Sequence, residues 1–174
     1  SAFRSSLGRV SWISTLIPRL SAPSSILAAS VSNLKVSDIK ALNGLILSIT
    51  REERRIRFRY LDPKRLNLVG FSDSSLNNLG SATQYGGLLG LADGGEIEKG
   101  KFASVNWLDW WSKKQRRVVK STFSAELLSL SSLLDRMSVT LDVLKNLVPI
   151  EGSYAFCDAA SVVTAVASSN PRVT

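Results

Sequence analysis

The stretch "SKKQRRVVKSTFSAELLSLSSLLDRM", residues 112–137, joins a cationic segment to a leucine-rich one. Lysines and arginines fill five of the eight positions in the cationic segment, residues 113–120. Apolar residues then recur every three or four positions, a spacing typical of a helix that buries one face. We therefore expect a helix over residues 122–148. Its buried stripe is predicted to hold Phe123, Leu127, Leu130, Leu134, Met137, Leu141, Leu144 and Val148.

A single carboxylate, Glu126, interrupts this apolar pattern near the start of the predicted helix. It lies three residues after Phe123 and four before Leu130, so the helical period places it on the buried side. Ionised carboxylates are rarely buried unless they are paired or bind a metal. In the first turn, the helix dipole would also stabilise its charge. The alternative is a capping-box acid, with Ser121 or Thr122 as the capping residue.

The rest of residues 66–174 alternates strand and helix patterns around this helix. Short apolar runs predict strands, and the segment "DGGEIEKGK", residues 93–101, predicts a turn. The order strand–strand–strand–helix–strand–helix indicates an α/β fold. The expected strands span residues 66–73, 83–93, 102–112 and 153–158, and the last helix spans 159–169.

The upstream part, residues 1–62, is expected to be mostly helical between residues 5 and 52. The period then changes, because apolar residues alternate with arginines in a pattern typical of a strand with one apolar and one cationic face. The alternating residues are Ile56, Phe58 and Tyr60 against Arg55, Arg57 and Arg59. The turn "DPKR", residues 62–65, is the predicted boundary between two modules.

Two further acids, Asp73 and Asp158, end predicted strands. Asp73 shares a strand face with Val69 and Phe71. Taken singly, Asp73 is explained by a turn and Asp158 by a helix N-cap. Taken with Glu126, they lie at ends that can meet at one edge of an α/β layer. Three carboxylates there would repel one another unless divalent cations neutralised them, and such a cluster suits two ions about 3.5–4 Å apart.

The composition excludes several kinds of site. The chain has no histidine and one cysteine, Cys157, so a zinc site of the usual N/S type and Ser–His or Cys–His hydrolases are excluded. Metal binding must then use oxygen ligands, which suit magnesium or manganese. The single cysteine favours a reducing, intracellular compartment, and no apolar run is long enough to span a membrane. The start lacks both an initiator Met and a signal-peptide core, so we expect an excised fragment of a longer chain.

The net charge of +8 lies in the first part of the chain. Residues 1–65 carry twelve Lys and Arg against four Asp and Glu, while the remainder is balanced. A basic excess favours an anionic partner, most often nucleic acid, and a cationic surface without a ligand is the alternative. The expected phosphate-binding residues are Lys113, Lys114, Arg116, Arg117 and Lys120, together with Arg55, Arg57 and Arg59. Trp107, Trp110 and Trp111 are candidates for stacking on bases, but core packing is the commoner use.

The motifs "GFSDSS", "YGG", "NWLDWWSKKQRRVVKSTFSAELLSL" and "YAFCDAASV" occur in an order that resembles the ribonuclease H domain of copia-type retroelement polyproteins. The segments "WWSKKQ" and "STFSAEL" match that family at the same spacing. This match spans residues 66–174. Upstream, "LGRVSWISTLIPRL", "VSDIKALNGLI" and "RIRFRYLD" look like the tail of the reverse transcriptase that precedes this domain, in its thumb or connection region.

The resemblance implies a ribonuclease H-like fold, a mixed sheet with helices on it. It implies that Asp73, Glu126 and Asp158 are catalytic carboxylates that bind two Mg²⁺ or Mn²⁺ ions. The implied activity is cleavage of the RNA strand in an RNA–DNA hybrid. The family's fourth carboxylate lies further on, and residues 159–174 hold no acid. We therefore expect the domain to be truncated at its C-terminus and to lack that ligand.

Three functions stay open at this point. The first is two-metal hydrolysis by part of a retroelement reverse transcriptase, with the hybrid and the rest of the parent polyprotein as partners, in a cytoplasmic particle or the nucleus. The second is a catalytically inactive module of the same fold that binds nucleic acid or serves a structural role. The third is a DNA nuclease or recombinase of the same superfamily.

Overall fold

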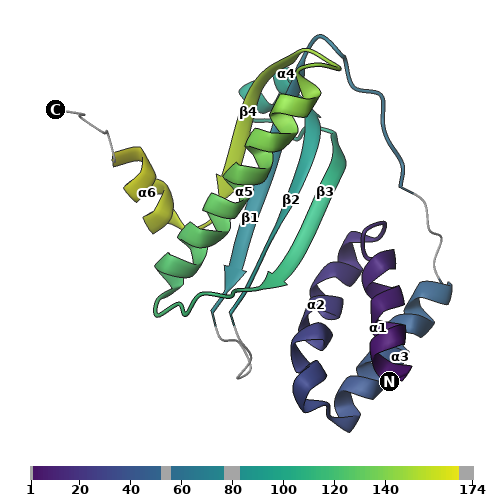
Figure 1. Cartoon of the computed structure of the whole chain (residues 1–174). Coiled ribbons are helices and arrows are strands. Elements are labelled where there is room, and N and C mark those ends of the chain that lie inside the picture. The colour runs from purple at the N-terminus through teal and green to yellow at the C-terminus, as the bar shows by residue number, and fades with distance from the viewer. Residues whose placement is uncertain (1, 52–55, 77–82, 169–174) are drawn as a thin grey trace.

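The computed structural model describes residues 2–51, 56–76 and 83–168 (Figure 1). Helices make up the N-terminal part, and they pack on one another around a small apolar core of their own. They are α1 (Ala2–Ile13), α2 (Ser21–Ser30) and α3 (Val36–Arg51), with the 3-10 turns η1 (Pro18–Leu20) and η2 (Val31–Asn33). Their core holds Leu7, Val10, Leu20, Leu27, Leu42 and Ile49. The prediction of a mostly helical upstream part is confirmed here. None of the described helices has the length and apolarity needed to cross a bilayer.

One mixed sheet forms the second part, with its strands in the order β3-β2-β1-β4. The strands are β1 (Leu66–Ser75), β2 (Gln84–Asp93), β3 (Val105–Lys114) and β4 (Ile150–Cys157). β1 pairs antiparallel with β2 and parallel with β4, and β2 pairs antiparallel with β3. A parallel pair needs a crossover connection, which the long helix α5 (Thr122–Leu144) provides. The predicted α/β fold and its order of four strands are confirmed.

α5 lies along one face of the sheet and supplies three of the seven buried residues of the second core (Figure 1). The core holds Leu68, Leu89, Trp111, Leu130, Leu133, Met137 and Val162, the last from helix α6 (Ala160–Ser168). Trp111 is 6% exposed, so the expectation that core packing is the use of this tryptophan is confirmed.

The predicted buried stripe on α5 is confirmed at Leu130 and Met137, which are buried, and is wrong at other positions. Phe123, Leu127 and Leu134 are 38–47% exposed. The buried face is turned toward Leu133, because Leu133 and Met137 occupy the space above Gly70 of β1. A Cβ atom at Gly70 would lie 2.7 Å from Leu133 Cδ1 and 2.8 Å from Met137 Sδ. The sheet surface therefore decides which of two adjacent leucine rows is buried.

The strand expected over residues 56–60 is absent, and this segment has no regular structure. Asn106 of β3 holds it, since its Nδ2 donates to Arg59 O at 2.7 Å and its Oδ1 accepts from the Arg59 N–H at 2.8 Å. One side-chain amide thus takes both backbone groups that a neighbouring strand would bind. Phe58 and Tyr60 are exposed, so the alternation buries no apolar face and the prediction of a strand is wrong.

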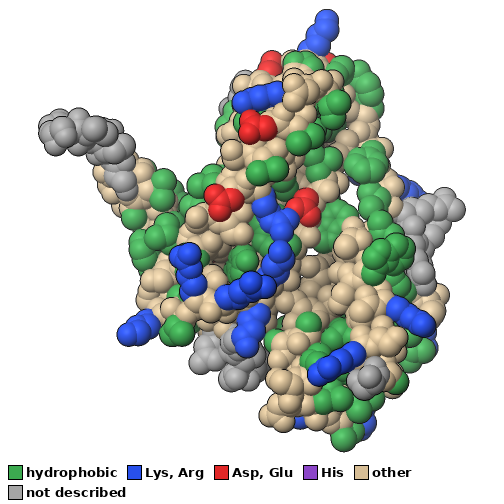
Figure 2. Space-filling model, in the orientation of Figure 1, with side chains coloured by type: hydrophobic (Ala, Val, Ile, Leu, Met, Phe, Trp, Pro, Cys, Tyr) green, Lys and Arg blue, Asp and Glu red, His purple; other side chains and the backbone are tan. Residues whose placement is uncertain are grey.

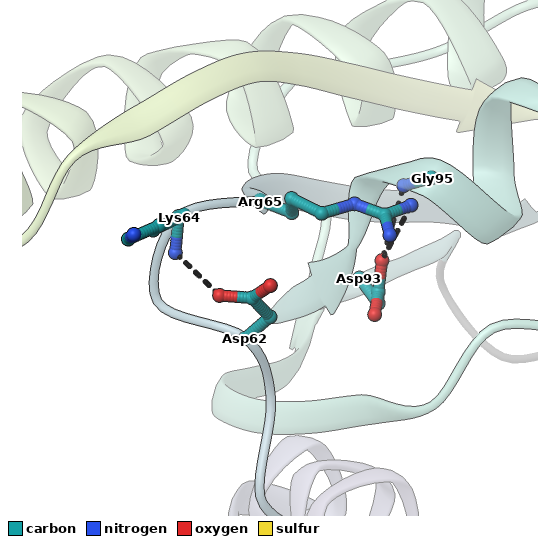
Figure 3. Close-up of polar contacts among 5 residues, drawn as sticks. All are labelled: Asp62, Lys64, Arg65, Asp93 and Gly95. Carbon is teal, nitrogen blue, oxygen red and sulfur yellow. Dashed lines mark hydrogen bonds and ion pairs between the residues drawn. The ribbon is translucent and has the colours of Figure 1, made fainter.

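The predicted turn over residues 62–65 is confirmed. Asp62 Oδ1 accepts a hydrogen bond from the Lys64 N–H at 2.9 Å, and Asp62 O accepts one from the Arg65 N–H at 3.0 Å. The Arg65 guanidinium then reaches across to Asp93 at 3.4 Å (Figure 3). This ion pair ties the start of β1 to the end of β2.

The predicted turn after β2 contains a short helix, α4 (Gly94–Glu98). Asp93 caps it by accepting a hydrogen bond from the Gly95 N–H at 3.1 Å (Figure 3). Gly95 lies against the Arg65 side chain, which leaves no room for a Cβ. Gly100, with a φ of 64°, reverses the chain after the helix. A five-residue helix with two glycines leaves no apolar period, which is why the sequence indicated only a turn.

The N-terminal helices contact the sheet at its β3 edge. Trp110 Nε1 of β3 donates a hydrogen bond to Ser14 O at 2.7 Å. Ser25 Oγ of α2 donates to Gln84 Oε1 of β2 at 3.2 Å. Since Gln84 pairs with Lys114, α2 lies beside the end of β3 where the cationic segment begins.

Candidate functional site

The three predicted acids come from elements that reach the same end of the sheet. β1 and β4 are parallel, so their C-terminal ends lie at one edge. Asp73 is in the last part of β1, and Asp158 directly follows β4. α5 starts at this edge because β3 ends there, and it carries Glu126 as its fifth residue. The sequence-based expectation of one shared edge therefore agrees with the observed topology.

Glu126 is buried, with 5% of its surface exposed. The N-cap of α5 is Ser121, whose Oγ accepts a hydrogen bond from the Ser124 N–H at 3.1 Å. The capping-box position is thus Ser124, and the Ser121 and Ser124 hydroxyls lie 2.9 Å apart. The capping-box explanation of Glu126 is therefore wrong, and so is its placement in the first turn. It faces inward beside the apolar core instead, as the helical period predicted.

Glu126 has two close neighbours with ligand atoms. A carboxylate oxygen of Glu126, Sγ of Cys157 and a carboxylate oxygen of Asp158 all lie within 4.8 Å of one another. Oε2 of Glu126 is buried and has no hydrogen-bond partner in the described structure. An unpartnered buried carboxylate oxygen is costly, so this is a place where a cation or a proton stabilises the fold.

Asp73 is not a member of this close group among the described residues. The period of β1 explains its position, because Gly70 faces α5 and Asp73 therefore belongs to the opposite face with Phe71. Asp73 is exposed and lines a pocket of about 380 Å³ that also includes Tyr85 and Ile26 of α2. The structure thus brings Glu126 and Asp158 together and leaves Asp73 at the neighbouring strand end.

The charges of the three acids nevertheless act on one another. Burial raises the pKa of Glu126 above its ordinary value, and the negative charges of Asp73 and Asp158 raise it further. The polar groups of Ser74, which lies against Glu126, partly oppose this rise. Neither Asp73 nor Asp158 forms an ion pair with a cationic side chain among the described residues. α6 begins at Ala160, so the residue directly before the helix is Ala159 and Asp158 is not its N-cap.

Sequence reasoning missed three polar groups at this site. From Cys157 the composition indicates only that usual N/S zinc sites and Cys–His hydrolases are excluded and that the compartment is reducing, yet its thiol belongs to the close group. Ser72 pairs with Cys157 across the β1–β4 ladder, and the hydroxyls of Ser72 and Ser74 are buried without a hydrogen-bond partner. The available signal was the strand period, which places Ser72 and Ser74 on the face toward the helix.

The cationic segment borders a groove of about 870 Å³ next to α2. The groove is lined by Ser25, Ala28, Ala29, Tyr85, Lys113, Lys114, Gln115, Arg116 and Arg117. All five cations of the cationic segment, including Lys120, are exposed. Figure 2 shows Lys and Arg side chains gathered over the end of the sheet where β3 passes into α5. Tyr85 lines both this groove and the pocket that holds Asp73, so the two adjoin.

The arginines upstream of the sheet lie elsewhere. Arg55 falls outside the described residues, and Arg59 is bound to Asn106 near the start of β3. Lys113 is at the other end of that strand, roughly 23 Å away at about 3.3 Å per residue. The structure therefore does not bring Arg59 to the cationic segment with which it was grouped.

Comparison of the chain with protein-family models, with curated proteins and with solved structures finds no match.

Proposed function

We propose that residues 66–174 are a ribonuclease H-like nuclease domain from a retroelement reverse transcriptase, and that residues 1–62 are the tail of the polymerase before it. The observation that carries the proposal is Glu126, a buried carboxylate with an unpartnered oxygen beside Asp158, at the sheet end where the cationic segment begins. A merely structural acid at that position would be paired or exposed. The proposed activity is cleavage of the RNA strand in an RNA–DNA hybrid.

The topology supports this proposal. The resemblance implies a mixed sheet with helices on it, and the chain has a four-stranded mixed sheet with α5 on one face. In sheets of this kind, ligands bind beyond the carboxyl ends of the strands. Asp73 and Asp158 stand at such ends here.

The residues present fit divalent cations of the magnesium type. Carboxylate oxygens are the ligands these ions prefer, and the unpartnered Oε2 of Glu126 offers one. Glu126 and Asp158 would hold an ion, and Asp73, at the neighbouring strand end, would be the third carboxylate of the proposed site. A pair of such ions supplies a water activated for attack and stabilises the leaving oxygen of a phosphodiester. The chain's own contribution is to hold these oxygens at one edge and to keep Glu126 away from bulk water.

The groove beside α2 supports a nucleic-acid substrate. Lys113, Lys114, Arg116 and Arg117 would contact backbone phosphates, and Tyr85 offers a ring for contact with a ribose or base. Contacts to phosphates and 2′-hydroxyls carry little sequence information, so the substrate would be selected by its groove shape. The groove adjoins the pocket of Asp73, which would place a bound backbone near the acids.

A cleavage assay tests the proposal. The full chain is incubated with Mg²⁺ and an RNA–DNA hybrid labelled on either strand, and with duplex DNA of the same sequence. We expect cleavage of the RNA strand alone, reduced at least about 100-fold by Asp73→Asn, Glu126→Gln or Asp158→Asn. Asp142→Asn is the matched control, because this acid is exposed near the far end of α5. Unchanged cleavage by Asp73→Asn contradicts the catalytic assignment, and preferred cutting of duplex DNA favours a DNA nuclease.

One observation favours a second candidate, a non-catalytic nucleic-acid-binding module of the same fold. Asp73 is exposed and stands apart from the close group of Glu126 and Asp158. If the hybrid binds tightly in the groove and no strand is cut with Mg²⁺ or Mn²⁺, this second function is selected. Salt-dependent hybrid binding is expected under both proposals, so binding alone does not separate them.

A further inference from the structure

We infer that Glu126, Cys157 and Asp158 form a mixed thiolate–carboxylate site for a thiophilic divalent cation of the Zn²⁺ or Co²⁺ class. The inference concerns the site of the proposed nuclease but rests on its own geometry. It assigns to Cys157 a ligand role, contrary to the expectation from composition that metal binding uses oxygen ligands alone, and it makes the site bind such a cation more tightly than Mg²⁺.

The distances suit a single ion. The three ligand atoms lie within 4.8 Å of one another. In zinc sites, metal–sulfur bonds are about 2.3 Å and metal–carboxylate bonds about 2.0–2.2 Å, so two ligands of one ion are at most about 4.5 Å apart. Around a tetrahedral ion three such ligand atoms are about 3.4–3.7 Å apart, so atoms at the 4.8 Å limit would approach one another by about 1 Å to close the site. Two donors come from the adjacent positions 157 and 158 at the end of β4, which limits how far they can separate.

The polar atoms around the site independently indicate a missing ligand. Glu126 is 5% exposed, and its Oε2 has no hydrogen-bond partner. Ser72 Oγ, opposite Cys157 in the β1–β4 ladder, is also buried without a partner. Two unsatisfied polar atoms at one place are rare in a folded protein, and a cation with bound water would satisfy them.

The donor set decides the class of cation. Carboxylates alone suit Mg²⁺ and Mn²⁺, whereas a thiolate ligand shifts the preference toward softer ions such as Zn²⁺ and Co²⁺. On binding, the Cys157 thiol gives its proton to solvent and its sulfur bonds to the ion. Two carboxylates and one thiolate carry three negative charges, one more than a divalent cation neutralises, and three protein ligands leave a position for water.

The single cysteine makes the test specific. The full chain is reduced, freed of metal with a chelator and titrated with Co²⁺, while thiolate-to-cobalt charge-transfer absorption is recorded. Any such band must come from Cys157, because the chain has no other cysteine. We expect a saturating band that Zn²⁺ displaces at equimolar concentration and that a large excess of Mg²⁺ does not. Cys157→Ser abolishes the band, and circular dichroism checks that the variant is folded.

The carboxylates are tested by affinity. Glu126→Gln and Asp158→Asn are each expected to weaken Co²⁺ binding at least about tenfold, while the control Asp142→Asn leaves it unchanged. Absence of the band overturns the inference. It is also overturned if Glu126→Gln and Asp158→Asn both bind Co²⁺ as tightly as the parent protein does, since the thiol would then bind the ion alone. Hybrid cleavage with Mg²⁺ is measured on the same samples. Cleavage without a cobalt band refutes this inference and supports the proposed nuclease. A cobalt band without cleavage supports this inference and contradicts the proposed nuclease.

Discussion

At the scale of single residues, Glu126 explains why this end of the sheet differs from a plain apolar core. It occupies a position on α5 where the helical period demands an apolar side chain, and the structure gives one of its oxygens no partner. Proteins keep such a local conflict chiefly at functional sites. The position of Glu126 was predictable from the period, whereas the role of Cys157 was not, because proximity of residues 126 and 157 depends on the pairing of β1 with β4.

Replacement of Glu126 by Gln is expected to stabilise the fold at neutral pH in the absence of metal. Burial raises the pKa of Glu126, so the charged form is disfavoured in the folded state. This penalty is present at pH values above the raised pKa and disappears as the pH falls through it toward the ordinary value. Urea unfolding with a chelator should show a gain of about 1 kcal/mol at pH 7 and little difference at about pH 4. A loss of stability at pH 7 would contradict an unpaired charge at this site.

At the scale of elements, the order of strands and helices was predictable because each has its own hydrophobic period. The phase of α5 was not, since Leu133 and Leu134 are equally apolar and only the surface of the sheet selects between them. The prediction of a strand over residues 56–60 was wrong for a different reason. There the period is clear, but Asn106 binds the backbone of Arg59 and no strand partner exists among the described residues.

Gly70→Ala tests the packing of α5 on β1. The new methyl would crowd Leu133 and Met137, so we expect a loss of about 1–3 kcal/mol in the free energy of unfolding. Gly44→Ala in α3 is the control, because nothing lies within 4 Å of a Cβ there. That substitution should stabilise by roughly 0.5–1 kcal/mol through the higher helix propensity of alanine. Equal effects of the two changes in denaturant unfolding would contradict the tight contact.

Substitution of both Arg116 and Arg117 by Ala tests the cationic segment. Each lost phosphate contact lowers the slope of log affinity against log salt by about 0.7–0.9, so the double variant should lose about 1.5 in slope. Fluorescence anisotropy with a labelled hybrid at several salt concentrations measures this. Lys145→Ala is the matched control, because Lys145 follows the far end of α5. If the slope of log affinity against log salt equals that of the parent protein, Arg116 and Arg117 do not contact phosphates, and the groove is not part of the interface.

At the scale of the whole molecule, the N-terminal helices help to form the proposed interface. α2 supplies one wall of the groove and also contributes Ala22 and Ile26 to the pocket that holds Asp73. The sequence separated the two modules at residues 62–65 but did not predict their contact, because Trp110 and Ser14 are 96 residues apart. Long-range pairing of this kind depends on the assembled fold and leaves no local pattern.

Trp110→Phe is expected to loosen this contact. It removes the hydrogen bond to Ser14 O and keeps most of the ring, so the fold should lose about 1 kcal/mol of stability. Hybrid affinity should fall a few-fold while the salt slope stays unchanged, because no phosphate contact is removed. Val139→Ala, at a residue 67% exposed on α5 and outside the cationic segment, is the control for a general effect of surface changes. An unchanged affinity with the expected loss of stability would show that α2 is not part of the interface.

The central claim is that Asp73, Glu126 and Asp158 jointly bind divalent cations at the carboxyl ends of β1 and β4. The most direct measurement is an anomalous difference map from crystals of the full chain grown with Mn²⁺. We predict one or two peaks within about 2.2 Å of carboxylate oxygens of all three residues. A map with no peak between them, or with peaks that Asp73 does not touch, would contradict the proposed two-metal site.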